Sequence, residues 1–164
     1  MTQEIDLEKY HQLALQKQKE HRKVLANLKK KPPKNLDKIA QEIHDEVFQE
    51  IDCTACANCC KTLGPDFKEA DITRIAKYFK MKLPAFEAEF LEVEEDGDKV
   101  FKSMPCPFLG GDNLCSIYDV RPKACREFPH TDRKKIYQIN HLTIKNTLTC
   151  PAAYLFVEKL KDRL

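Results

Sequence analysis

Apolar residues recur at helical spacing along much of this chain, most clearly in its first third. The apolar positions of residues 4–28 predict one amphipathic helix. It has to end within residues 29–34, because two prolines there remove backbone donors and favour extended backbone. Asn35 is a suitable N-cap for a second helix, whose apolar stripe leads directly to Cys53. We expect the two helices to pair as an N-terminal antiparallel hairpin with a basic, proline-containing linker.

Weaker periodic segments follow in the second half of the chain. Residues 69–79 return to helical spacing, and Pro84 and Pro151 each suit the first turn of a further helix. Residues 99–104 alternate enough for one short strand after a polar turn. We therefore predict a mainly α fold with at most a short β-hairpin.

The stretch from residue 105 to residue 130 differs from the rest, because it is dense in Pro, Gly, Cys and Arg and has little periodicity. That composition is typical of an irregular region organised around an ion. At 164 residues the chain is expected to form a single domain. Within it, we assign residues 1–52 to the helical hairpin and linker, and residues 53–164 to a cysteine-cluster, metal-binding domain.

Eight cysteines are the main clue to function. Four of them fall within eight positions, and the other four are spread over the second half. Thiolates are soft, anionic ligands that select zinc or iron–sulfur centres over magnesium or calcium. The eight candidate metal ligands are Cys53, Cys56, Cys59, Cys60, Cys106, Cys115, Cys125 and Cys150.

A disulfide framework is the alternative use of so many cysteines. Disulfide-rich scaffolds are usually shorter than about 80 residues and follow a secretory signal. Residues 1–18 contain no uninterrupted apolar run, and no stretch approaches the roughly 18 apolar residues of a membrane span. We therefore expect a cytoplasmic protein with reduced cysteines and no membrane association.

Charge gives little guidance to partners. The formal net charge is +2, from 28 basic and 26 acidic residues, so nothing favours nucleic acid as a partner. The distribution is uneven, since residues 17–38 are strongly basic whereas residues 84–98 hold acidic but no basic side chains. The amphipathic stripes of the hairpin are typical of core, and binding of a protein partner through the hairpin is the less favoured interpretation.

The adjacent Cys59 and Cys60 restrict how the thiols can be shared. In a helix their side chains diverge by about 100°, which is awkward for one tetrahedral ion. They therefore serve different metal atoms, or one of them stands back. Eight thiols would support two ions with four ligands each, or one polynuclear centre.

The identity of the metal stays open between two alternatives. The C-x2-C spacing is the commonest zinc hook, and zinc is the cofactor that we predict. Iron or a [4Fe-4S] cluster is the alternative, because Cys53, Cys56 and Cys59 have the spacing of a bacterial ferredoxin. In such proteins the remote ligand precedes proline, as Cys106 and Cys150 do here.

The ordered set of motifs closely resembles the CxxCxxCC cysteine-cluster family. The motifs are Cys53-x2-Cys56-x2-Cys59-Cys60, Cys106-Pro-Phe-Leu, Cys115-Ser-Ile-Tyr118, Arg121-Pro-x2-Cys125-Arg126-x-Phe-Pro and the late Cys150. The resemblance leaves the N-terminal hairpin uncovered. It implies a bacterial, cytosolic domain that chelates zinc or iron and has an undefined cellular role. A related cluster in flagellin lysine N-methylase suggests an enzymatic branch of the family.

We thus expect a metal-binding protein and leave open whether it is an enzyme. The alternatives are an iron–sulfur enzyme or redox protein, including one that modifies proteins, and an interaction adaptor with a structural metal. Among the neighbouring residues, Arg121 and Arg126 would balance the charge of the thiolates. Tyr118 would pack against the site with its hydroxyl hydrogen bonded. His130 and His141 could each replace a cysteine as ligand, although a surface position is the favoured interpretation for both.

Overall fold

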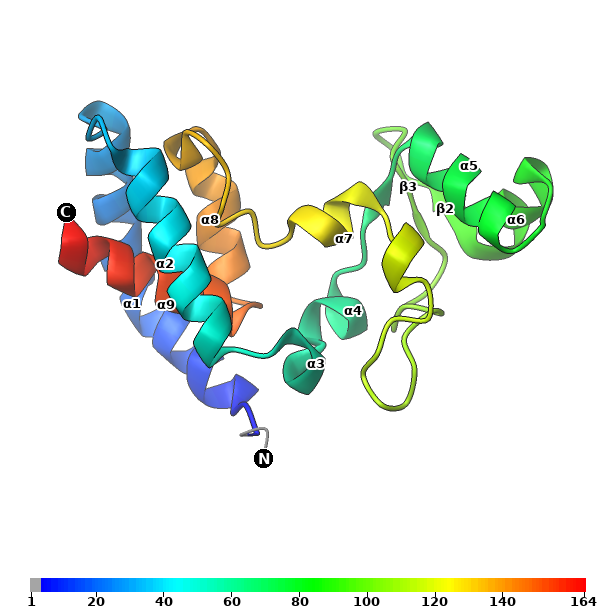
Figure 1. Ribbon diagram of the computed structural model, residues 1–164, viewed down its shortest axis with the longest axis horizontal. Helices are drawn as coiled ribbons and strands as arrows, with labels where there is room; N and C mark the ends of the chain where they lie inside the picture. The colour runs from blue at the N-terminus through cyan, green and yellow to red at the C-terminus, as the bar shows by residue number, and fades with distance from the viewer. Residues whose placement is uncertain (1–3) are drawn as a thin grey trace. The chain divides into compact units, whose positions relative to one another are not determined.

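The computed structural model describes residues 4–164 of the chain (Figure 1). Most of these residues are helical and one small antiparallel sheet is present, so the prediction of a mainly α fold is confirmed. The chain forms two compact units, which are described separately. One contains residues 4–56 and 129–164, and the other contains residues 57–128.

The first unit is a helical bundle. Its helices are α1 (Leu7–Lys30), α2 (Leu36–Glu50), α3 (Cys53–Cys56), the 3-10 helix η2 (Ile136–Ile139), α8 (Asn140–Thr147) and α9 (Pro151–Arg163). The side chain of Asp6 caps α1 by accepting a hydrogen bond from Lys9 N at 3.0 Å. Apolar residues such as Ile43, Phe156 and Leu160 are fully buried and form the core. The stripes of α1 and α2 therefore serve packing within this unit.

The two N-terminal helices find their main partners at the C-terminal end of the chain. Helix α2 packs against α9, while α1 packs against α8, α9 and η2. His21 on α1 is fully buried, and its Nε2 lies 2.6 Å from Glu158 Oε1 on α9. The N-terminal helices are thus built into a larger bundle, and their pairing with one another is secondary.

The second unit combines short helices with the sheet. Its elements are α4 (Asn58–Thr62), β1 (Asp66–Phe67), α5 (Glu69–Tyr78), α6 (Leu83–Phe90), β2 (Leu91–Val93), β3 (Lys99–Phe101), the 3-10 helix η1 (Tyr118–Val120) and α7 (Lys123–Glu127). The strand order is β1-β3-β2, and β2 and β3 form the expected short hairpin. The core gathers aromatic rings around Phe108, including those of Phe86 and Phe101.

The segment with four cysteines is not one continuous helix. Ala57 has φ 50°, in the left-handed region that residues other than glycine seldom adopt, and it separates α3 from α4. Cys53 and Cys56 therefore lie on α3, whereas Cys59 and Cys60 lie on α4. The four cysteines are thus divided between two short helices.

Within residues 4–164, no helix combines the length and the apolar character that a membrane span requires.

Candidate metal centre

The structure divides the eight candidate ligands between the two units. The helical bundle carries three of them, which are Cys53, Cys56 and Cys150. The unit of residues 57–128 carries the other five, which are Cys59, Cys60, Cys106, Cys115 and Cys125.

Backbone hydrogen bonds bring three segments of the second unit together around the cysteines. Cys106 N donates to Cys60 O at 2.8 Å, which joins the loop after β3 to α4. Leu109 and Cys115 form an isolated antiparallel bridge, and Gly110 N donates to Leu114 O at 2.8 Å. The loop of residues 106–116 thus closes on itself and carries Cys106 at one end and Cys115 at the other.

Backbone N–H groups point at the sulfur atoms of this loop. Phe108 and Leu109 donate to the Cys106 thiol, and Ile117 donates to the Cys115 thiol. Such hydrogen bonds favour the ionised form of a thiol, because a thiolate is a far better acceptor than S–H. The loop conformation therefore suits thiolates that bind a cation.

The thiols of this unit also lie within electrostatic range of one another. Burial raises the pKa of Cys106 to about 11, and nearby Cys60 and Cys115 add to the rise. The pKa of Cys125 is raised to about 12 by desolvation of its thiol and then by the other three thiols, although much of the residue is exposed. Burial is also the first cause that raises the pKa of Cys115. Four thiolates here would repel one another, so they need a cation.

Cys60 differs from its neighbours. A hydrogen bond from the Cys59 thiol lowers the pKa of Cys60 to about 7, against the opposing effect of burial. Cys60 is therefore the first thiol of the group to ionise near neutral pH, and it is best placed to make the initial contact with an ion.

The three cysteines of the helical bundle form a second group. Cys150 is the N-cap residue of α9, and its thiol faces the N–H groups of Ala152 and Ala153. Burial raises the pKa of Cys150 to about 12, and Cys53 and Cys56 raise it further. These three thiols thus also share one neighbourhood.

The thiols lie in two groups, but neither group surrounds a position that a metal ion could occupy. Among the described residues, 4–164, no three Cys, His, Asp or Glu side chains have an arrangement that would hold an ion. His141 is exposed on α8. Binding would therefore require the thiol side chains to turn toward the ion, as expected where metal binding completes the fold.

Arg121 acts electrostatically on two of these thiols. It lowers the pKa of both Cys115 and Cys125, which agrees with a role in charge balance. We expected Tyr118 to pack against the thiols, but its ring lies elsewhere. It is 60% exposed, and its ring stacks under the Arg121 guanidinium at 3.8 Å from the centroid.

A buried carboxylate that sequence reasoning missed holds the Cys125 segment in place. Asp71 on α5 is 2% exposed and accepts hydrogen bonds from Lys123 N at 3.1 Å and Arg74 Nη2 at 2.8 Å. Arg74 in turn donates to Val120 O at 3.2 Å and Arg121 O at 2.9 Å. The only sequence signal is the i,i+3 spacing of Asp71 and Arg74 in a helix, which is too common to single them out.

Asp71→Ala is expected to loosen the attachment of η1 and α7 to α5. Burial opposes ionisation of Asp71, but N–H groups and Arg74 outweigh it and hold its pKa below the usual range. Removing this carboxylate leaves its donors unpaired, so we expect a loss of about 2–3 kcal/mol in the free energy of unfolding. Chemical denaturation of the protein as purified, with its metal bound, measures it. Asp119→Ala, at an exposed position on η1, is the control and should change little. Equal stability of the two variants would contradict the assignment.

Two groups of soft thiol donors, with backbone N–H groups at the sulfur atoms of Cys106, Cys115 and Cys150, define a cysteine-rich protein of the kind that chelates metals. The donors fit zinc or iron by their chemistry. The chain belongs to the CxxCxxCC family, described as a "putative zinc- or iron-chelating domain", whose model matches residues 52–151. Searches of the curated proteins and of the solved structures found no match.

Proposed function

We propose that this protein binds metal ions through two separate groups of cysteine thiolates. Cys60, Cys106, Cys115 and Cys125 would hold one ion within residues 57–128, and the thiols of Cys53, Cys56 and Cys150 would hold a second within the helical bundle. The observation that carries the proposal is the convergence of N–H groups and neighbouring thiols on the sulfur atoms of Cys106, Cys115 and Cys150. Cys59 stays a candidate ligand, because its thiol contacts that of Cys60.

The metal would act chiefly on structure. A tetrahedral thiolate centre supplies folding free energy and fixes loops that lack periodic apolar packing. In this chain Cys106 and Cys115 close an irregular loop, and Cys125 lies on a helix of only five residues. Arg121 would offset part of the negative charge of four thiolates around one divalent ion. A reducing compartment such as the cytoplasm keeps thiols in the form that this function needs.

Zinc is the ion that we propose, with iron or a [4Fe-4S] cluster as the alternative. Visible absorption distinguishes the two metals. Zinc has a filled d shell and gives no visible absorption, whereas iron–sulfur clusters absorb broadly near about 400 nm. We expect protein purified without oxygen to be colourless and to contain about two zinc ions per chain by elemental analysis. Broad visible absorption together with acid-labile sulfide would instead establish the iron–sulfur alternative.

A further inference from the structure

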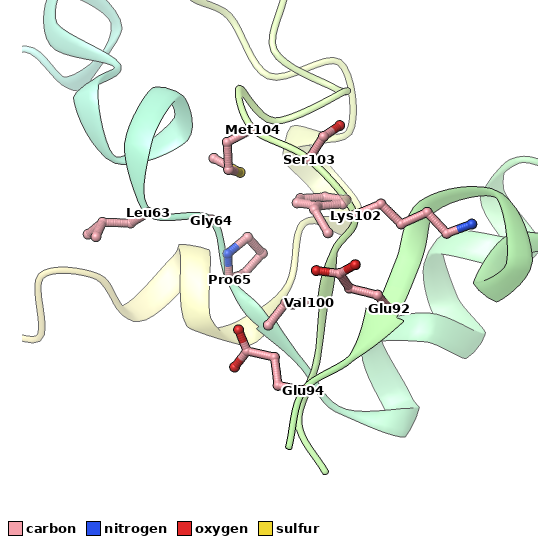
Figure 2. Close-up of a pocket in the computed structure, with 10 residues that line it drawn as sticks. Leu63, Gly64, Pro65, Glu92, Glu94, Val100, Lys102, Ser103 and Met104 are labelled. Carbon is pink, nitrogen blue, oxygen red and sulfur yellow. The ribbon is translucent and has the colours of Figure 1, made fainter. Parts of the chain in front are cut away.

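A small pocket in the second unit lies beside the sheet, and no cysteine lines it (Figure 2). Its volume is about 290 Å³, and Val100, Met104 and Pro65 give it an apolar wall. The size is near the lower end of the range for ligand sites, so it suits one long side chain better than a cofactor.

Gly64 allows the pocket to take this shape. The backbone there has φ 64°, which glycine adopts at no cost. A Cβ at this position would lie 2.9 Å from Met104 Sδ, closer than packed side chains approach. A side chain at residue 64 would therefore push Met104 away from its present place at this end of the pocket.

Two carboxylates complete the lining. Glu92 lies opposite Val100 in the β2–β3 pair, and Glu94 follows the end of β2. Figure 2 shows both carboxylates close to Val100, while the Lys102 ammonium points away from them. Lys102 instead donates to Ala88 O.

The other nearby lysines are also engaged elsewhere. Lys99 binds Glu69 and Glu87, and Lys68 binds Asp66. Within the part of the chain that the structure describes, neither Glu92 nor Glu94 has an ion-pair partner. The pocket thus joins an apolar wall to two carboxylates without a counter-charge.

We propose that this pocket receives a lysine or arginine side chain of a partner protein. The aliphatic stem would lie against Val100 and Met104, and the charged end would reach Glu92 and Glu94. A protein segment offers more contact than a free amine, because Leu63 at the pocket's edge is 42% exposed and gives an apolar neighbour of the bound lysine a surface to lie on. This inference goes beyond metal binding, and its test therefore uses protein that retains its metal.

The test uses the full-length protein as purified and a fluorescein-labelled peptide, Gly-Leu-Lys-Leu-Gly. Fluorescence anisotropy measures its affinity for the wild type and for Glu92→Gln, Glu94→Gln and Glu95→Gln. Glu95 is exposed in the same acidic turn but does not line the pocket, so its substitution removes an equal charge. We expect the first two variants to bind about tenfold more weakly, because each removes a charged partner of the ligand, and the third to bind within about twofold of the wild type.

Two further ligands make the result decisive. Acetylation of the peptide's lysine should abolish binding, because it removes the charge, and butylamine should bind more weakly than the peptide. The proposal is wrong if the peptide does not bind at about 1 mM, if Glu95→Gln weakens binding as much as Glu92→Gln, or if the acetylated peptide binds equally well. Butylamine binding as tightly as the peptide would also overturn it, since the partner would then be a free amine.

Discussion

Cys60→Ser is expected to remove the metal held by residues 57–128 and to leave the metal of the helical bundle in place. Among Cys60, Cys106, Cys115 and Cys125, Cys60 has the lowest pKa, at about 7. Its carbonyl oxygen also accepts the hydrogen bond from Cys106 N that positions the Cys106 segment. A serine hydroxyl stays protonated and is a poor ligand for a soft metal. Metal content should therefore fall from about two ions to about one per chain, and the unit of residues 57–128 should lose its cooperative unfolding.

Cys150→Ser is the matched variant for this experiment. It should also reduce metal content to about one ion, but it should spare the unfolding of residues 57–128. Hydrogen exchange read by mass spectrometry assigns each loss to a unit, because amides of the affected unit would exchange faster. The proposal of two centres fails if either substitution releases all of the metal, since one polynuclear centre behaves in that way. It also fails if neither substitution changes the metal content.

Periodicity located the longer helices well because their apolar stripes are continuous. The structure places α2 at Leu36–Glu50 and α5 at Glu69–Tyr78, within a residue or two of the sequence prediction. Helix α8 was not predicted, because its buried face contains Thr143, Asn146 and Thr147, which no apolar pattern marks. Thr143 and Thr147 donate to carbonyls one turn earlier, at Ile139 and Ile144. Asn146 Nδ2 instead donates to Pro129 O, a bond that only tertiary structure provides.

The candidate ligands were available from the sequence, but their grouping was not. Because neighbouring side chains diverge, adjacent Cys59 and Cys60 indicated that they serve different metal atoms or that one of them stands back. The placement of Cys150 beside Cys53 and Cys56 depends on packing of α9 against α2, which links residues about a hundred positions apart in sequence. The break at Ala57 was equally hidden, because alanine has no preference for the left-handed region that it adopts.

Metal affinity of the second unit is expected to rise steeply with pH, even in alkaline solution. At pH 9 Cys60 is ionised, because its pKa is about 7. Cys106 and Cys125 remain protonated, because their pKa values are about 11 and about 12, and the pKa of Cys115 is also raised. An ion that binds all four thiolates must therefore displace about three protons, and affinity should increase about 1000-fold per pH unit. Thiols with the ordinary pKa near about 8.5 would already be ionised by pH 9.5, and the increase would stop there.

The experiment isolates the second unit by using Cys150→Ser as the background. Zinc affinity is measured by competition with a chelator whose own pH dependence is known, from pH 7 to pH 10. Proton release is measured independently by calorimetry in two buffers that differ in their enthalpy of ionisation. Release of about three protons at pH 9 would show that the raised pKa values belong to the ligands of the ion. Release of fewer than one proton would mean either that the thiols are already ionised or that they do not bind the metal. Either result would contradict the proposed four-thiolate centre.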